Sequence, residues 1–277
     1  MVVALFGRTA CALCAAVSIL LALAGAGGAS EHVGELYRAS TIITGTQEHE
    51  KQRGFAASLE RVLVKLSGDP DLAGSPKVVG LAVRAAEFVQ DYELRDRMAG
   101  IPVHDEQGTR DRPHILTVEF ARAKVDRALR ELGHEPWLDR PPITLAVSID
   151  NGTQQFMLGE GAEAGAAQRE ALTQTGAELG LTIDFPGQAA LARVAGDTPL
   201  SWADRERLED ARRELGAKVL LAGTLTWDEK ALRWSSTWRL LTEESLERWG
   251  AGGVSFDTVF RSTLEKAMQV LSSRARR

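Results

Sequence analysis

Apolar residues recur at helical spacing in the first organised part of the chain. Between Gln47 and Leu66 they stand three and four positions apart, and Gly68 follows the last of them. This spacing puts one apolar stripe on a helix, and glycine is the residue that most often ends a helix. The stripe consists of Phe55, Leu59, Val62, Leu63 and Leu66. It predicts a helix with one face packed against a partner layer.

The surrounding segments complete a small α/β unit. Their apolar periodicity and loop residues predict a strand before the helix, a shorter helix after it, a pair of strands and a last helix. These elements are expected over residues 35–43, 47–66, 77–87, 88–98, 114–120 and 122–132. The order is βααββα, and we expect it to form an N-terminal domain over residues 30–134.

Three prolines punctuate residues 135–142, which read Glu-Pro-Trp-Leu-Asp-Arg-Pro-Pro. Proline fixes φ and lacks a backbone donor, so this segment predicts a stiff linker. Beyond it, residues 143–277 predict a second domain with the order βαβαβββα. Its strands are expected over residues 143–149, 181–185, 218–227, 232–241 and 246–254, and its helices over 166–179, 201–215 and 256–271. The expected fold class is α+β, with two small α/β domains, the second built on a mixed sheet.

Two stretches of the second domain carry local signals. Residues 150–165 are polar and rich in glycine, which predicts a mobile loop. Ser201 stands three residues before Asp204, as in a capping box with an acid in the first turn of a helix. We therefore expect the helix to open at Ser201.

The first 29 residues differ from the rest of the chain. Arg8 is their only charge, an apolar run from Thr9 to Ala24 follows, and small residues close the segment. This is the organisation of a secretory signal peptide, and the run is shorter than the roughly 20 residues that span a bilayer. An uncleaved anchor is the alternative. We expect residues 1–29 to be removed, leaving a periplasmic protein without a stable membrane span.

Composition narrows the chemistry of the mature chain. Both cysteines, Cys11 and Cys14, lie in the predicted signal, so disulfides and thiolate chemistry leave with it. Lys and Arg number 33 against 38 Asp and Glu, and the resulting net charge of -5 argues against a general nucleic-acid binder. The five histidines do not show the helical spacing of zinc ligands. The sequence predicts no catalytic residue, no cofactor and no metal site.

Five of the six tryptophans follow the proline-rich segment. Trp227, Trp234 and Trp238 fall on two neighbouring strands of a predicted hairpin, and the even spacing of Trp234 and Trp238 puts both on one face. Such a cluster can bind a partner protein or sugar rings, or it can pack under the last helix. We take these three residues as the candidate partner or ligand surface, with core packing as the alternative.

Several landmarks together resemble a known family. They are Leu36-Tyr37-Arg38, Arg53, Leu59, the run Val-Leu-Val-Lys-Leu-Ser-Gly-Asp over residues 62–69, Trp137, Arg140-Pro141-Pro142, the run Val-Leu-Leu-Ala-Gly over 219–223, and Trp238. The chain is similar in these positions to the proteobacterial envelope proteins grouped as domain of unknown function 2066. That family has no assigned activity, so the resemblance implies an envelope protein and no mechanism. The C-terminal element order also resembles small α/β domains of outer-membrane lipoprotein cofactors and of the Tol system's periplasmic protein, which generally bind other proteins.

An exported chain without a recognisable nucleophile, metal set or phosphate loop predicts a non-enzymatic protein. We expect it to bind a protein partner in the cell envelope or to assist an assembly there. One alternative is a carbohydrate-active hydrolase that uses paired carboxylates, with the tryptophans as a sugar platform. The other is a module that binds a small ligand between the two domains. Exposed tryptophan rings beside a pair of acids would favour the hydrolase.

Overall fold

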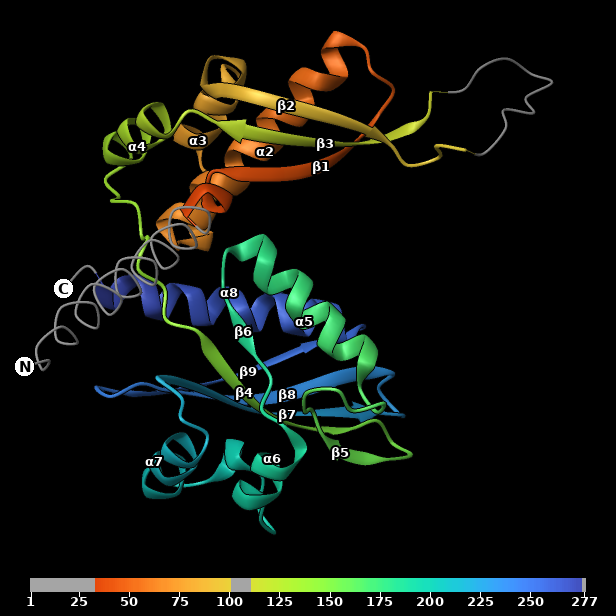
Figure 1. The fold of residues 1–277 in the computed structure, drawn as a ribbon, viewed down its shortest axis with the longest axis vertical. Helices are drawn as coiled ribbons and strands as arrows, with labels where there is room; N and C mark the ends of the chain where they lie inside the picture. Colours follow the sequence, from red (N-terminus) through yellow and green to blue (C-terminus); the bar gives the residue numbers. More distant parts are fainter. Residues whose placement is uncertain (1–32, 101–110, 276–277) are drawn as a thin grey trace, which may run out of the picture.

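The computed structural model describes residues 33–100 and 111–275, and it confirms the α+β fold class. The chain forms two units, each built on its own sheet (Figure 1). The predicted signal peptide lies outside the described residues. Among the helices of the described ranges, none combines the length and the hydropathy of a membrane-spanning segment.

The N-terminal unit is a three-stranded antiparallel sheet with a long helix packed across one face. Its strands are β1 (Arg38–Thr44), β2 (Val89–Asp96) and β3 (Pro113–Phe120), and its helices are α2 (Glu48–Ser67), α3 (Pro76–Ala82) and α4 (Arg122–Glu131). Strand β3 lies between β1 and β2. The chain order agrees with the predicted βααββα pattern.

Helix α2 forms where the apolar stripe predicts it. Leu59, Val62, Leu63 and Leu66 are completely buried, and each fully buried leucine contributes roughly 1.5–3 kcal/mol. Gly68 adopts a φ of 65° and donates its N–H to the carbonyl of Val64, which ends the helix in the left-handed conformation. The sequence therefore encodes both the packed face and the end of this helix.

The beginning of the first strand differs from the prediction. Residues 33–36 are helical, and β1 starts only at Arg38. The physical reason is that Leu36 and Tyr37 are both buried, with 1% and 2% of their surface exposed. A strand turns successive side chains to opposite faces, so a strand here would have exposed one of the two.

The C-terminal unit is built on a six-stranded mixed sheet. Its strands are β4 (Ile143–Asp150), β5 (Gln155–Met157), β6 (Ile183–Asp184), β7 (Val219–Asp228), β8 (Arg233–Leu241) and β9 (Leu246–Gly253). The order across the sheet is β5-β4-β7-β8-β9, and β6 pairs with β4 as well. Strand β4 runs parallel to β6 and β7, whereas the other pairs are antiparallel. The mixed sheet expected from the sequence is present.

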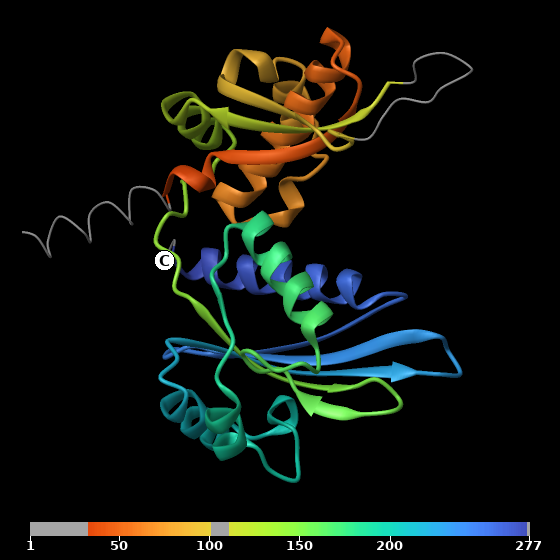
Figure 2. The ribbon, with the colours of Figure 1, turned by 45° about the vertical axis from the view of Figure 1, so that its right-hand side comes forward.

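Helices cover both faces of this sheet (Figures 1 and 2). One face carries α5 (Ala166–Leu179) and α8 (Phe256–Ala275), and the other carries α6 (Gln188–Val194) and α7 (Arg205–Glu214). Strands β4 and β7 are consequently buried on both sides, which explains why their sequences are nearly continuous apolar runs.

Several local predictions for the C-terminal unit need correction. Residues 150–165 are not a loop throughout, because Asn151 accepts hydrogen bonds from the backbone N–H groups of Thr153 and Gln154 and closes a hairpin between β4 and β5. Helix α6 was not predicted, and the strand expected over residues 181–185 is the two-residue β6. The observed order is ββαβααβββα.

The expected start of helix α7 is also wrong. Asp204, not Ser201, caps it by accepting a hydrogen bond of 3.0 Å from the N–H of Arg207. Ser201 lies one turn earlier in a short 3₁₀ segment, where its buried hydroxyl is 2.5 Å from the hydroxyl of Thr224. The residue three positions after the cap is an arginine, so the reciprocal half of a capping box is missing.

Candidate functional site

The structure separates the three tryptophans of the predicted surface. Trp238 is 0% exposed, its ring centroid is 6.4 Å from that of Phe260 in α8, and its Nε1 donates to Ser236 Oγ at 2.7 Å. Trp227 and Trp234 are half-buried farther along the hairpin, with ring centroids 5.3 Å apart. Trp238 therefore belongs to the core beneath α8, and only the other two rings reach the surface.

A cleft of about 630 Å³ lies between the two units. Its walls come from the outer face of the N-terminal sheet, the last turns of α2 and the C-terminal end of α5. The polar residues that line it are Glu35, Arg38, Ser40, Arg61, Lys65, Thr117 and Glu178. Cavities of this size bind small ligands in many proteins, and such sites often lie at the junction of two domains. We take this cleft as the candidate functional site.

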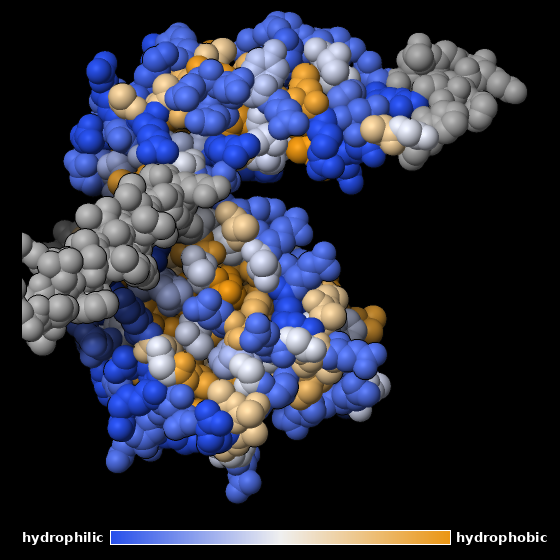
Figure 3. Space-filling view, in the orientation of Figure 1, coloured by the Kyte–Doolittle hydropathy of each residue, from blue (hydrophilic) through white to orange (hydrophobic). Residues whose placement is uncertain are grey.

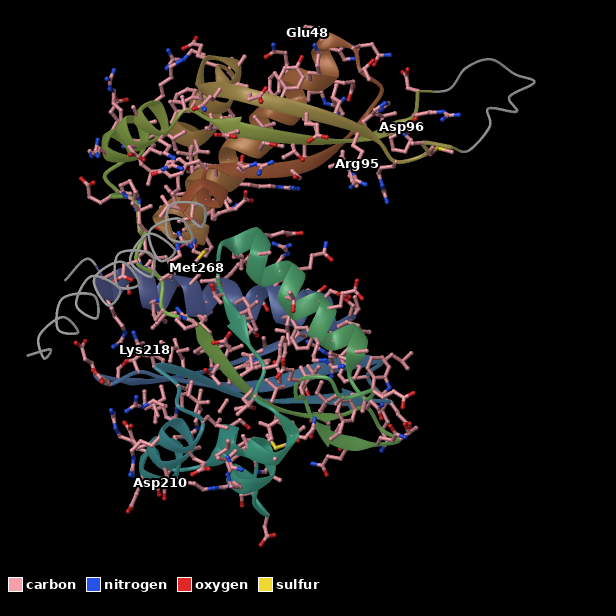
Figure 4. The ribbon with its side chains drawn as sticks, viewed as in Figure 1. Glu48, Arg95, Asp96, Asp210, Lys218 and Met268 are labelled. Atoms are coloured by element: carbon pink, nitrogen blue, oxygen red, sulfur yellow. The ribbon has the colours of Figure 1, made fainter. Side chains whose placement is uncertain are left out.

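The outer face of the N-terminal sheet can line the cleft because α2 covers only the inner face. Along β3, Leu116 and Val118 are completely buried against the helix side, whereas Thr117 points the other way into the cleft. Figure 4 shows Arg95 of β2 projecting on this outer side, toward the C-terminal unit. In Figure 3 the N-terminal unit extends over the C-terminal one, with open space between them.

Lys65 is the buried charge of the cleft. Its side chain is 6% exposed, and its Nζ donates to the carbonyls of Arg38 at 2.8 Å and Glu35 at 3.3 Å. Burial and, after it, the charge of Arg140 lower the pKa of Lys65 to about 8, against a weaker opposing effect of Glu35 and Glu178. An anion entering the cleft would favour the protonated ammonium, so binding would stabilise its charge.

A second cation of the cleft is exposed. Arg61 donates from Nη1 to the carbonyl of Ser40 at 2.6 Å, and among the described residues neither Arg61 nor Lys65 forms an ion pair with a carboxylate. The two nearby acids are engaged elsewhere, because Glu35 pairs with Arg38 and Glu178 pairs with Arg261 of α8. The cleft therefore offers net positive charge within low-dielectric walls, which attracts anions.

Arg140 forms hydrogen bonds to both units beside the cleft. It is 8% exposed and donates to four backbone carbonyls, from Nε to Trp137 at 2.9 Å, from Nη1 to Leu179 at 3.0 Å and Gly180 at 3.2 Å, and from Nη2 to Lys65 at 2.5 Å. Three of these carbonyls stand at the C-terminal ends of α2 and α5, where helix dipoles favour a cation. Burial lowers the pKa of Arg140 to about 10. One guanidinium thus joins helix ends from both units.

Close packing surrounds this guanidinium. Its carbon lies 4.2 Å from the centre of the Trp137 ring, and Trp137 donates its backbone N–H to the carbonyl of Leu66. Ser272 of α8 donates to the carbonyl of Gly68, and Figure 4 shows Met268 on the side of α8 that faces the N-terminal unit. We call this contact region, centred on Lys65, Arg140 and Trp137, the joint.

The joint is not predicted from the sequence. Residues 135–142 are predicted to be a linker and Gly68 to end a helix, although both take part in the contact. A signal was present, because Trp137 and Arg140 are unusual in a segment that is simply exposed, and Lys65 interrupts an otherwise apolar helix end. What the sequence could not supply was the partner of each group.

The three described histidines do not gather at the cleft. His49 lies beside Glu50, His114 contacts the carbonyl of Arg112, and His134 lies near Asp69, whereas His32 and His104 are outside the described residues. Nowhere in residues 33–100 and 111–275 do three His, Cys, Asp or Glu side chains come together as a metal site would require. The cleft lining offers hydroxyls, cations and carboxylates.

One family model matches the chain, over residues 30–138, and its description is Domain of unknown function (DUF8605). The match covers the N-terminal unit and the beginning of the segment that leads to the C-terminal unit. No curated protein matches the chain. The comparisons therefore assign no activity.

The resemblance to domain of unknown function 2066 is wrong, since the matching family is a different one. The residues that suggested it have a structural explanation. The run over residues 62–69 is the end of α2 with its glycine cap, and Trp137 and Arg140 hold that end in the joint. An amphipathic helix that ends at glycine is a general pattern, so this run does not identify a family.

Proposed function

We propose that this chain is an exported protein of the bacterial cell envelope that binds a partner protein without catalysing a reaction, and that the cleft receives a carboxylate of that partner. The observation that carries the proposal is the combination of buried Lys65 and exposed Arg61 in one cleft, with no described carboxylate paired to either. The signal-peptide pattern of residues 1–29 supports export.

The geometry favours a carboxylate over other groups. The Arg61 guanidinium is a planar fork that matches the two oxygens of a carboxylate, and Lys65 adds a point charge deeper in the cleft. The hydroxyls of Ser40 and Thr117, which are 2.9 Å apart, lie on the same wall and can bond to the backbone of the bound segment. An acidic side chain or a chain terminus of the partner would fit these groups.

A small carboxylic acid is the second candidate ligand. The cleft volume of about 630 Å³ lies within the range of small-molecule sites, and this observation favours a ligand-binding module. The hydrolase alternative loses support, because a sugar platform of Trp234 and Trp238 requires exposed rings and Trp238 is buried.

Site-directed crosslinking in living cells tests the proposal. A photoreactive residue at Thr117, in the cleft wall, is expected to give a discrete adduct with the partner, and the charge reversal Arg61→Glu is expected to abolish it. The matched control places the same photoreactive residue at Arg127, an exposed position on α4 remote from the cleft. Equal adducts at both positions, or an adduct that persists in the Arg61→Glu chain, would contradict the cleft as the binding site.

Export is tested separately by fractionation and by the mass of the purified protein. We expect the chain in the periplasmic fraction with a mature N-terminus close to Ser30. A full-length chain that stays in the cytoplasm would refute the envelope role. The crosslinking experiment would still test whether the cleft binds a partner.

A further inference from the structure

Three arginines line the face of the C-terminal sheet that is opposite to α5 and α8. Arg233 and Arg239 belong to β8 and Arg248 to β9. Arg239 pairs across the sheet with Ala222, a residue of the core beneath α6 and α7, which places its side chain on that face. Arg248 is the direct cross-strand partner of Arg239. Like charges opposite each other repel, so folding alone does not explain this pair.

Within the described ranges these three arginines form no ion pairs, whereas most other arginines of this unit do. Among the described residues no carboxylate forms an ion pair with Arg233, Arg239 or Arg248. Six other arginines of the unit do form ion pairs, namely Arg193, Arg205, Arg212, Arg213, Arg261 and Arg274. Arg169 and Arg207 likewise form no ion pair with a described carboxylate, but they belong to helices α5 and α7, whereas the three arginines share one face of the sheet.

Hydroxyl groups, glycines and two aspartates make up most of the remainder of this surface, namely Thr224, Thr226, Ser235, Thr237, Gly250, Gly252, Asp150 and Asp228. Asp228 is the cross-strand partner of Arg233, but the carboxylates of Asp150 and Asp228 accept hydrogen bonds from backbone N–H groups of their own turns and form no ion pair with a described arginine. The guanidinium of Arg233 lies over Gly252, where an added Cβ would be 2.6 Å from Nη2. We call this surface, together with the three arginines, the arginine face.

An exposed aromatic ring borders the arginine face. Trp202 is 61% exposed in a short turn that rests on the sheet, because the neighbouring Ser201 bonds to Thr224 and accepts a hydrogen bond of 2.7 Å from Arg239 Nε. In Figure 2 the lower helices cover one end of the sheet, and the strands extend beyond them. An aromatic platform, a row of hydroxyls and unpaired cations thus lie next to one another.

We propose that the arginine face binds an acidic polysaccharide, with its carboxylates on the arginines, its hydroxyls on the threonine and serine side chains, and one sugar ring on Trp202. The rise of a strand, about 3.4 Å per residue, separates Arg233 from Arg239 by about 20 Å, so the ligand is an extended chain with spaced charges. Arginine forms bidentate bonds with carboxylates.

The surface is less suited to other anionic macromolecules. Single-stranded nucleic acid is held by several aromatic rings along a basic groove. Within the described ranges this face has one exposed aromatic ring at its border, Trp202, and the whole chain carries a net charge of -5. An anionic membrane favours protruding apolar side chains beside the cations, whereas the centre of this face consists of hydroxyls and glycines.

The test is a titration of the purified protein with oligogalacturonate, an unbranched chain of uronic acids. Its methyl-esterified form, which has the same sugars without the charges, is the matched control ligand. We expect saturable binding to the acid that weakens as ionic strength rises, and no binding to the ester. Binding of both forms alike, or of neither, would overturn the proposal.

Variants locate the site. Arg233→Gln together with Arg248→Gln is expected to weaken oligogalacturonate binding about tenfold, and Trp202→Ala about fivefold. Arg127→Gln removes the same charge on the remote helix α4 and is expected to leave binding unchanged. Unfolding temperatures are expected to stay within experimental error for all three, which separates lost binding from lost structure.

Two competing ligands complete the test. The protein is titrated with a single-stranded DNA oligonucleotide and with phosphatidylglycerol vesicles at the same ionic strength. One of these ligands could bind more tightly than oligogalacturonate and lose affinity in the double variant. That result would overturn the proposal and identify that ligand class as the occupant of the arginine face. Oligogalacturonate binding that the double variant does not weaken would also refute the proposal. None of these outcomes depends on the cleft.

Discussion

The joint and the arginine face both contain cationic side chains, but these are buried and hydrogen-bonded at the joint and mostly exposed on the arginine face. At the joint, Lys65 and Arg140 are buried and donate to backbone carbonyls. On the arginine face, Arg233 and Arg248 are exposed and no described carboxylate is paired with them. A buried cation is tolerated only where hydrogen bonds replace its lost hydration, whereas an exposed cation costs little and remains free to meet a ligand. Removing a cation should therefore affect stability at the joint and binding on the face.

The largest expected effect is at Arg140. Arg140→Met removes the donors of four hydrogen bonds and leaves their carbonyls buried, so we expect the free energy of unfolding to fall by about 3–5 kcal/mol. Urea denaturation of the two proteins measures the difference. Arg248→Gln is the matched control and is expected to change stability by less than about 0.5 kcal/mol. Equal losses for both variants would show that the comparison between buried and exposed cations is wrong.

The lowered pKa of Lys65 at the joint predicts that the free energy of unfolding depends on pH. Burial lowers its pKa from the usual 10.5 to about 8, so below pH 8 both folded and unfolded chains hold the proton and the folded state bears the cost of the buried charge. Between about pH 8 and 10.5 the folded chain releases the proton while the unfolded chain keeps it. The free energy of unfolding is therefore expected to rise by about 3 kcal/mol over this range relative to Lys65→Met.

The measurement is urea denaturation of both proteins at several pH values across that window. The groups common to both chains, such as Tyr37, whose pKa burial and a hydrogen bond to Asp126 raise, cancel in the difference. Parallel profiles for the two proteins would mean that Lys65 carries its full charge in the folded state at all these pH values.

The elements that sequence reasoning located well are those with local signals. The predicted helix over residues 166–179 has the bounds of α5, and the helix predicted from Gln47 to Leu66 is α2, displaced by one residue. Both have glycines at their ends and several turns in which to show periodicity. Helix α6 has seven residues and β6 has two, which is too short for a period to be recognised.

The joint beside the cleft and the arginine face both depend on pairings that the sequence does not contain. Arg140 meets the carbonyl of Lys65 across 75 positions and that of Leu179 across 39, so no local pattern indicates the joint. On the arginine face, the alternation of β8 already separates Arg239 from Trp238, but the register that sets Arg239 opposite Arg248 is fixed by the turn between β8 and β9. The burial of Trp238 likewise depends on α8, which follows it in the chain.

The smallest expected effect compares two glycines with the same backbone conformation. Gly180 at the joint has a φ of 68° and Gly216 in an open turn has a φ of 63°, so alanine at either position incurs a left-handed backbone cost of about 1–2 kcal/mol. A Cβ at Gly180 would also lie 2.6 Å from Leu36 Cδ2, whereas nothing lies within 4 Å of one at Gly216. We expect Gly180→Ala to be less stable than Gly216→Ala by about 2 kcal/mol in urea denaturation. The backbone cost is the same at both positions, so an equal loss of unfolding free energy in the two variants would mean that the joint rearranges to accommodate the methyl group. The two units would then be held together there by Arg140 and not by close packing.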